Sequence, residues 1–116
     1  QRLNDLHRCD LETMTWARIP GDGGFIGDVP TPRYFHSCAV NNGSMYVFGG
    51  YDGSHRLGDL FEHNLGTGTW TKLVRFHDPH GDAPTARSSL VAHVHENSPF
   101  IFGGYNNEAR VYPFVE

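Results

Sequence analysis

Histidine is the residue type in this chain whose chemistry most readily suggests a site, because neutral imidazole is the commonest metal ligand in proteins. The 116 residues include 8 histidines. His93 and His95 are two positions apart and would lie on one face of a strand. His77 and His80 flank Asp78-Pro79 in a segment expected to be a loop. Neither pair has a third ligand at a spacing typical of zinc sites, so we expect no bound metal and no cofactor.

Catalytic arrangements are not recognisable in the sequence either. It contains no Gly-rich phosphate-binding motif, no HExxH metalloprotease motif and no Ser/His/Asp order of a known type. The acidic residues are scattered over segments expected to be turns, where carboxylates bond to nearby backbone amides. These residues are Asp10, Glu12, Asp22, Asp28 and Asp52. We therefore predict no catalytic residue in this chain and no enzymatic activity.

The composition favours short strands joined by tight turns. The chain has 14 Gly and 7 Pro, which turns require, and 2 Trp, 5 Tyr and 8 Phe, which suit strands. A formal charge of −4 without a basic run argues against nucleic-acid binding. No apolar stretch reaches the roughly 18 residues that span a bilayer, so we expect no membrane insertion. Cys9 and Cys38 are too few for a disulfide framework, which favours a reducing, cytoplasmic setting.

Internal repetition is the strongest organising signal in the sequence. Many residues recur 54 positions later, always at the same offset, so no insertion separates the two copies. The recurring pairs include Trp16 and Trp70, Arg33 and Arg87, Gly49-Gly50 and Gly103-Gly104, Tyr51 and Tyr105, and Asp5-Leu6 and Asp59-Leu60. This number of matches at one offset identifies a structural repeat.

Each period contains four strand-like segments, and no window has the 3.6-residue periodicity of an amphipathic helix. Runs rich in β-branched and aromatic residues, bounded by Gly, Pro, Asn or Asp, define these segments. The expected strands are Leu6–Asp10, Thr15–Ile19, His36–Val40, Ser44–Phe48, Leu60–Asn64, Thr69–Leu73, Leu90–Val94 and Ser98–Phe102. Four short strands in about 50 residues are typical of one blade of a β-propeller.

Residue sizes indicate how such a blade would pack. The run from Ser37 to Val40 is small and β-branched, which suits an inner strand crowded near the propeller axis. The run from Met45 to Phe48 is apolar on both faces, as expected between neighbouring blades. The glycines that follow it leave room for a bulky side chain, and we expect the repeated Trp to fill that space.

The repeated residues resemble the kelch repeat, whose pattern is Arg-x-x-His-Ser, an aromatic strand ending in Gly-Gly-Tyr-Asp-Gly, then Asp-Leu, then Trp. The matching runs are Arg33-Tyr34-Phe35-His36-Ser37, Tyr46-Val47-Phe48-Gly49-Gly50-Tyr51-Asp52-Gly53, Asp59-Leu60 and Trp70. The resemblance covers essentially the whole chain. Within kelch proteins, the run from Pro32 to Trp70 looks most like the leucine-zipper-like transcriptional regulator group of BTB-kelch adaptors.

The resemblance implies an all-β fold, a fragment of a kelch-type propeller with two blades of four antiparallel strands. The residues that recur in both copies would then have structural roles within the blades. These positions are Trp16, Arg33, Gly49, Gly50, Trp70, Arg87, Gly103 and Gly104. We expect Arg33 and Arg87 to pair within their own blades.

The repeats are expected to begin and end in mid-blade. Residues 1–32 would hold strands three and four of one blade with a linker loop, 33–86 one full repeat, and 87–116 strands one and two of the next blade. Pro113 stands where the repeat has Asp, and it cannot donate a backbone hydrogen bond. Since propellers close with about four to eight blades, we expect either an excerpt of a longer propeller or head-to-tail assembly, three chains making six blades.

The resemblance also implies where a partner binds. In kelch adaptors that bind degron peptides, contacts come from residues just after the Gly doublet and just after the Arg that opens the blade. The matching residues are Tyr51, Asp52, Tyr105, Asn106 and Asn107 after the doublets, and Tyr34, Phe35, Ser88 and Ser89 after the arginines. Tyr, Ser and Asn suit such a role because they combine contact area with hydrogen bonding. His55, Arg56 and Arg110 add positive charge to the same loop, which favours an acidic partner.

The functional expectation is therefore a protein-protein interaction module of the propeller type. Resemblance to the BTB-kelch adaptors extends it to the substrate-recognition part of a Cullin-3 ubiquitin ligase. Two alternatives stay open. One is a galactose-oxidase-like enzyme or a sugar-binding propeller. The copper enzyme would need Tyr and His ligands with a Tyr joined to a Cys, and nothing in the sequence marks such a set. The other alternative is a chain that self-assembles into a propeller ring.

Overall fold

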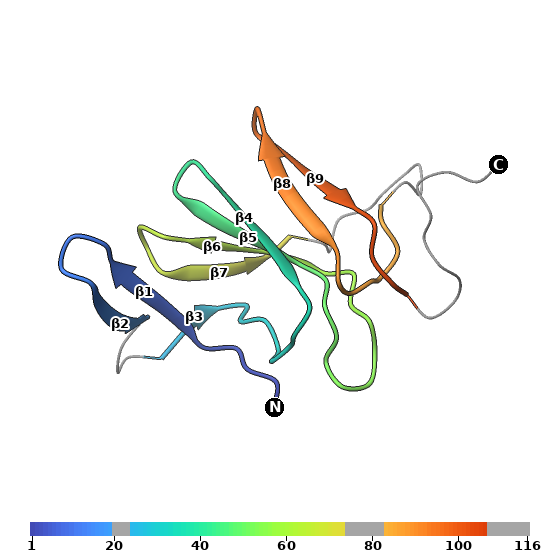
Figure 1. The fold of residues 1–116 in the computed structure, drawn as a ribbon, viewed down its shortest axis with the longest axis horizontal. Helices are drawn as coiled ribbons and strands as arrows, with labels where there is room; N and C mark the ends of the chain where they lie inside the picture. Colours follow the sequence, from blue (N-terminus) through green and yellow to red (C-terminus); the bar gives the residue numbers. More distant parts are fainter. Residues whose placement is uncertain (20–23, 74–82, 107–116) are drawn as a thin grey trace.

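The computed structural model describes residues 1–19, 24–73 and 83–106, and these residues form three antiparallel-rich sheets with no helix (Figure 1). A central sheet has the strand order β3-β7-β6-β5-β4, and two hairpins, β1-β2 and β8-β9, lie on either side of it. The all-β architecture predicted from the repeat is confirmed.

The strands are short, as the spacing of turn residues predicts. Their bounds are β1 Leu6–Asp10, β2 Thr15–Ile19, β3 Ile26–Gly27, β4 Ser37–Asn41, β5 Ser44–Phe48, β6 Leu60–Asn64, β7 Thr69–Lys72, β8 Val91–His95 and β9 Ser98–Phe102. The 54-residue offset is visible in this list, because β6 and β7 repeat β1 and β2, and β8 and β9 repeat β4 and β5.

Three predicted strands differ from the observed ones by one residue at a bound. The strand expected over His36–Val40 spans Ser37–Asn41, the strand expected over Leu90–Val94 spans Val91–His95, and the strand expected to end at Leu73 ends at Lys72. The first two shifts have a common cause. Phe35 (φ 60°) and Ser89 (φ 58°) adopt a left-handed conformation, which turns the chain before the extended segment can start.

The central sheet contains a fifth strand that the sequence did not predict. β3 pairs in parallel with β7, with Gly27 opposite Trp70, inside the segment expected to be a linker loop. Gly27 has φ 93°, and a Cβ atom there would collide with the carbonyl oxygen of Trp70. Only glycine permits this close approach of two backbones. A strand of two residues has too little sequence for any periodic pattern to reveal it.

The last hairpin joins the central sheet through its inner strand, since β4 and β8 contact each other and their hairpins lie side by side in Figure 1. Backbone hydrogen bonds connect the two units. Gly50 N donates to Arg87 O at 2.9 Å, and Ser89 N donates to Phe35 O at 2.8 Å. The expectation that a Trp fills the space beside the glycines is wrong. A Cβ on Gly49 would meet Arg87 O at 2.6 Å, so the doublet makes room for the neighbouring backbone.

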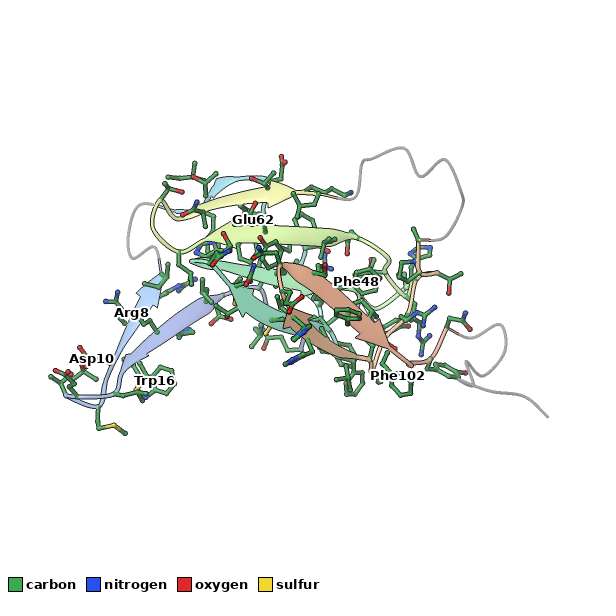
Figure 2. All side chains as sticks on the ribbon, turned by 90° about the horizontal axis from the view of Figure 1, so that it is seen from above. Arg8, Asp10, Trp16, Phe48, Glu62 and Phe102 are labelled. Carbon is green, nitrogen blue, oxygen red and sulfur yellow. The ribbon has the colours of Figure 1, made fainter. Side chains whose placement is uncertain are left out.

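Trp70 is the centre of the hydrophobic core. Its ring lies edge-on to Phe25 at 6.4 Å and to Phe61 at 6.5 Å between ring centroids, and it is 5% exposed. Its repeat counterpart Trp16, expected to have the same structural role, is 72% exposed and points away from the other strands (Figure 2). The difference in exposure arises because the sheet of Trp70 contains all four strands of a blade, β4 to β7. The β1-β2 hairpin corresponds only to the third and fourth strands of a blade among the described residues.

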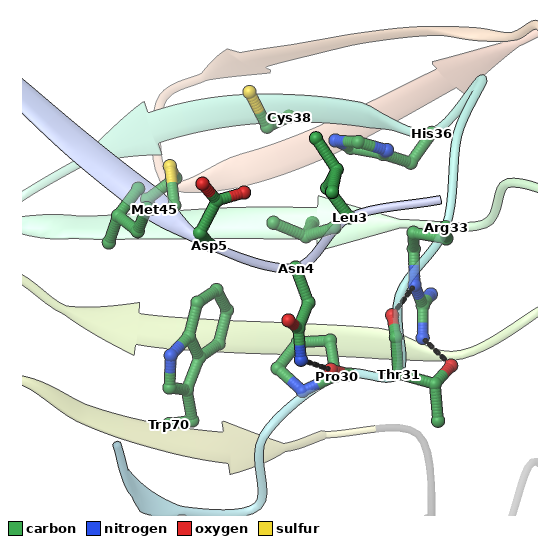
Figure 3. A pocket seen from close by; sticks show the side chains of 12 residues that line it. Leu3, Asn4, Asp5, Pro30, Thr31, Arg33, His36, Cys38, Met45 and Trp70 are labelled. Atoms are coloured by element: carbon green, nitrogen blue, oxygen red, sulfur yellow. Dashed lines mark hydrogen bonds between the residues drawn. The ribbon is translucent and has the colours of Figure 1, made fainter. Parts of the chain in front are cut away.

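The first hairpin is joined to the central sheet across a cavity of about 220 Å³ (Figure 3). Leu3 and Asp5 line one side, and Cys38, Met45 and Trp70 line the other. Asn4 donates to the carbonyl oxygen of Pro30 at 3.2 Å, and Leu3 forms an antiparallel bridge with Arg33. This arrangement places the segment before β1 beside the segment that opens the full repeat.

Two histidines with lowered pKa values, the buried His63 and the more exposed His36, make the fold sensitive to acid. Burial lowers the pKa of His63, and burial together with the charge of Arg33 lowers the pKa of His36. The His63 side chain is 1% exposed, and its Nδ1 has no hydrogen-bond partner among the described residues. Below about pH 6.5 the unfolded chain therefore binds protons that the folded chain excludes. The contribution of the two neutral histidines to the free energy of unfolding is present above that pH. It is lost as the pH falls toward their pKa values in the folded chain.

We expect the urea midpoint of unfolding to fall when the pH is lowered from about 7.5 to about 5.5, and the dependence to become shallower in His63→Phe. The matched control is His95→Phe, because the His95 side chain is 69% exposed. An unchanged slope in His63→Phe, or an equal flattening in the control, would contradict the assignment.

Candidate functional site

One end of the sheets gathers the loops that carry most of the predicted binding residues. Because β4 and β5 are antiparallel and Ser37 pairs with Phe48, the segment that enters β4 lies beside the loop that leaves β5. The same relation holds between β8 and β9, where Val91 pairs with Phe102. We call this end the loop face and define it as residues 33–36, 49–57, 87–90 and 103–106.

Two short bridges fix the residues of the loop face in pairs. Tyr34 N donates to Tyr51 O at 3.1 Å and Tyr51 N donates to Tyr34 O at 2.8 Å. In the second copy, Ser88 and Tyr105 exchange bonds of 3.0 and 2.9 Å. Four residues that the sequence places in two separate groups are therefore neighbours in space.

Asp52 shapes the loop that follows the first bridge. Its Oδ1 accepts hydrogen bonds from the backbone amides of His55 at 2.8 Å and Ser54 at 2.9 Å. These backbone bonds, that from His55 first, lower the pKa of the Asp52 carboxyl group. The carboxylate thus holds the turn that brings Arg56 back over Tyr51, with which Arg56 forms a backbone bridge.

Arg56 is the centre of the loop face because it connects the two repeats. The central carbon of its guanidinium lies 4.5 Å from the ring centroid of Tyr51 and 4.9 Å from that of Tyr105. Its Nε donates to Ser88 Oγ at 3.4 Å. The distances from the guanidinium carbon to the two ring centroids are within the range of cation–π interactions. Its Nη groups make no hydrogen bond with any residue of the described ranges, so the planar fork remains available to a carboxylate.

Exposed aromatic rings surround this cation. Tyr34 lies 4.7 Å from Phe35 and 5.7 Å from Tyr51 between ring centroids. Phe35 is 59% exposed and Tyr105 is 44% exposed. Tyr and Arg are the side chains that most often contribute large shares of binding energy at protein interfaces. The chemistry of the loop face is therefore suited to contact with a polypeptide.

Not every predicted residue joins this cluster. Asn106 donates to Thr85 Oγ1 at 3.4 Å, and Ser89 contributes a backbone bond to Phe35. Asn107 and Arg110 lie outside the described residues, as do His77 and His80. His93 and His95 lie on β8, away from the loop face.

Sequence reasoning missed one cation near the loop face. A Cβ on Gly53 would lie 2.6 Å from the central carbon of the Arg2 guanidinium, so Arg2 covers this glycine. Arg2 precedes Arg56 by one period of 54 residues. That shared phase was the signal that could have placed Arg2 here, because Arg56 reaches Tyr105 in the next repeat in a comparable way.

The partner of Arg33 was also missed. Arg33, 4% exposed, donates from Nη1 to Asp59 Oδ1 at 2.7 Å and from Nη2 to Asp59 Oδ2 at 3.2 Å. Nη1 also donates to Gly49 O at 3.1 Å. Nε donates to Thr31 O at 3.0 Å, and Figure 3 shows Arg33 beside Thr31. Arg33 therefore ties the segment before β4 to the start of β6 and forms a buried part of the loop face. The recurrence of Asp5 as Asp59 was a visible hint to this pair.

No group of three His, Cys, Asp or Glu residues that could hold a metal ion occurs in residues 1–19, 24–73 and 83–106. Within the same ranges, no helix is long and apolar enough to cross a membrane. Both cysteines are unpaired, with Cys38 exposed and Cys9 half-buried.

Comparison with known proteins identifies the class to which this fold and loop face belong. Residues 1–114 match the family described as the KLHDC2/KLHL20/DRC7 Kelch-repeats domain. The chain therefore belongs to the kelch-repeat family, its sheets are those of a kelch propeller, and it is a protein-interaction module of that type.

Individual relatives have the same repeats within longer chains. The chain is 34% identical, over 94% of its length, to the leucine-zipper-like transcriptional regulator 1 homolog of Drosophila melanogaster and covers 11% of that protein. It is 38% identical, over 92% of its length, to acyl-CoA-binding domain-containing protein 5 of Arabidopsis thaliana and covers 15% of it. It is 38% identical, over 89% of its length, to kelch domain-containing protein 1 of Mus musculus and covers 24% of it. The chain thus spans a small part of each of these relatives.

Proposed function

We propose that the loop face binds an acidic segment of a partner protein, with Arg56 as the central contact. The observation that carries this proposal is the position of the Arg56 guanidinium between the rings of Tyr51 and Tyr105. The two rings and Ser88 orient the fork in advance, so little side-chain entropy is lost when a carboxylate binds. Arg2 adds a second positive charge beside Gly53.

The surrounding aromatic side chains support a peptide rather than a small anion. Phe35 and Tyr34 extend the contact surface beyond the reach of a single carboxylate, and both rings are exposed. Apolar contact beside a charged hydrogen-bonding group is the usual composition of a protein-interaction hot spot. Ser88 and Asp52 are already engaged within the loops, so their role in this site is to hold Arg56 in position.

A random-peptide display library selected on the wild-type chain tests the proposal. We expect the enriched peptides to be acidic and to lose about tenfold or more in affinity for Arg56→Ala, measured by fluorescence anisotropy. The matched control is Arg18→Ala, which removes an exposed arginine from β2, outside the loop face. Enriched peptides without acidic residues, or equal losses in the two variants, would contradict the proposal.

We further propose that this module selects substrates for a Cullin-3 ubiquitin ligase in the cytoplasm. Support comes from the resemblance to the leucine-zipper-like transcriptional regulator group and from the free thiols of Cys9 and Cys38, which fit a reducing compartment. Depletion of Cullin-3 should raise the steady-state level of a protein that binds the wild-type chain but not Arg56→Ala. An unchanged level after depletion would contradict this role while leaving the binding proposal intact.

A further inference from the structure

Arg33 and Asp59 form an ionic clamp in the central sheet. Each of the two flanking hairpins contains one half of an equivalent clamp. In the complete version, the Arg33 guanidinium joins the carboxylate of Asp59 to the carbonyl groups of Gly49 and Thr31. Arg33 lies shortly before β4, the first strand of the blade, and Asp59 lies directly before β6, the third strand. The clamp therefore fastens the first half of a blade to its second half.

The β8-β9 hairpin carries the arginine half of this clamp. Arg87 donates from Nε to Thr85 O at 3.0 Å, from Nη2 to Thr85 Oγ1 at 3.0 Å and from Nη1 to Gly103 O at 3.0 Å. These bonds reproduce those of Arg33, except that no carboxylate of the described residues pairs with Arg87. In the sequence, the position 54 residues after Asp59 is Pro113, which has no carboxylate.

The β1-β2 hairpin carries the carboxylate half. Asp5 precedes Asp59 by 54 residues and lies just before β1, as Asp59 lies just before β6. Within the described residues, its carboxylate pairs only with His7, at 2.8 Å and at the surface. The outer edge of β1 has no strand beside it among residues 1–19, 24–73 and 83–106.

We propose that the β1-β2 hairpin of a second copy of this chain completes the β8-β9 half-blade, with Arg87 pairing with Asp5 of the partner copy. The β5-β6 pairing sets the register, since Met45 lies opposite His63 and Phe48 opposite Leu60. Shifted by one period, this register places β9 against β1 of the partner copy. The predicted pairs are Phe102 with Leu6, Ile101 with His7, Phe100 with Arg8, Pro99 with Cys9, and Ser98 with Asp10.

The exposed apolar side chains of both hairpins agree with this assembly. Phe100 is 57% exposed, Phe102 62% and Trp16 72%. Joining the hairpins and stacking the resulting blade between central sheets would cover all three. Each copy contributes two repeat periods, so three copies would close a six-bladed ring, which is within the range of natural propellers.

Pro99 limits the strength of the proposed junction. Gly43 O and Gly49 N, just outside the two ends of β5, form hydrogen bonds with residues that flank β6. Because alternate residues of an antiparallel strand hydrogen-bond to the same neighbour, Met45 and Val47 also direct their backbone N–H and C=O groups toward β6. Pro99 is the counterpart of Met45 and has no N–H to donate. The junction would therefore have one ladder hydrogen bond fewer than a complete blade, which also protects β9 from pairing with unrelated strands.

Sedimentation equilibrium of the 116-residue chain tests the assembly. We expect a concentration-dependent mass that rises to three times the 13.0 kDa of one chain. Arg87→Asp or Asp5→Arg alone should weaken association by about tenfold or more, because each places like charges in the clamp, and the double reversal should restore it. Glu12→Arg, a reversal in the exposed turn after β1, should have no effect. A monomeric wild-type chain would overturn the proposal, as would a single reversal that remains folded and associates like wild type.

An engineered disulfide tests the register without relying on charge reversal. In a Cys38→Ser background, Pro99→Cys should form an intermolecular disulfide with native Cys9, visible as a covalent dimer or ladder on non-reducing gels. The control Ser98→Cys places the thiol on the opposite face of β9 and should cross-link at least about tenfold more slowly. Equal cross-linking of the two variants, or none with Pro99→Cys, would overturn the proposed junction.

Discussion

Replacing Arg33 by Ala is expected to lower the unfolding free energy of the chain by about 3–5 kcal/mol. Arg33 is 4% exposed, and its removal leaves the Asp59 carboxylate, whose side chain is 18% exposed, without a charge partner. It also leaves the carbonyl groups of Gly49 and Thr31 without their side-chain donor. Urea unfolding followed by tryptophan fluorescence measures the loss.

The repeat supplies the control for this experiment. Arg87 makes the same three bonds to Thr85 and Gly103 without a carboxylate, and part of its surface is accessible. Arg87→Ala should therefore cost about 1–2 kcal/mol, provided that both variants are measured at a concentration where wild type is monomeric. Equal losses in the two variants would show that the Asp59 pair contributes nothing beyond the bonds to carbonyl groups.

Trp70→Ala is expected to have an effect of similar size, about 3–5 kcal/mol, because it leaves a large cavity in the core. The ring packs against Phe25 and Phe61, and its centroid lies 4.6 Å from that of His63. Differential scanning calorimetry should show a large drop in the unfolding temperature. An unfolded variant at 25 °C would agree with the same account.

Trp16→Ala is the matched control for Trp70→Ala, because both remove a tryptophan at the same repeat position. Trp16 is 72% exposed, so its loss should change the unfolding free energy of the monomer by about 0.5 kcal/mol or less. Comparable destabilisation by the two substitutions would mean that Trp16 is buried in solution, and would place a further strand or a second copy against the β1-β2 hairpin.

The repeated residues were sufficient to predict the strands because periodicity reports on local structure. Eight segments with alternating or continuous apolar residues became strands within one residue of the expected bounds. β3 escaped prediction because it has two residues, and its pairing depends on a backbone contact between Gly27 and Trp70. Contacts between distant glycines and backbone groups leave no periodic trace in a sequence.

The loop face was predictable in outline and not in detail. The family pattern predicted Tyr51 and Tyr105 as contact residues, and the sequence places Arg56 in the same loop as Tyr51. The stacking of Arg56 between the two rings depends on how neighbouring repeats approach. That approach is set by Gly50, whose amide bonds to Arg87 O, and by the absence of a Cβ at Gly49. The sequence shows these glycines as a repeated doublet, and only the structure shows which backbone occupies the space beside them.

Hydrogen–deuterium exchange of the wild-type chain, with and without the acidic peptide most enriched by display, tests the central claim most directly. Binding at the loop face predicts slower exchange in residues 50–57 and 104–106, with unchanged exchange in the turns after β1 and β6, at the opposite end of the strands. The protection should disappear in Arg56→Ala at the same peptide concentration. Protection confined to those opposite turns, or protection of the loop face that persists in Arg56→Ala, would contradict the account.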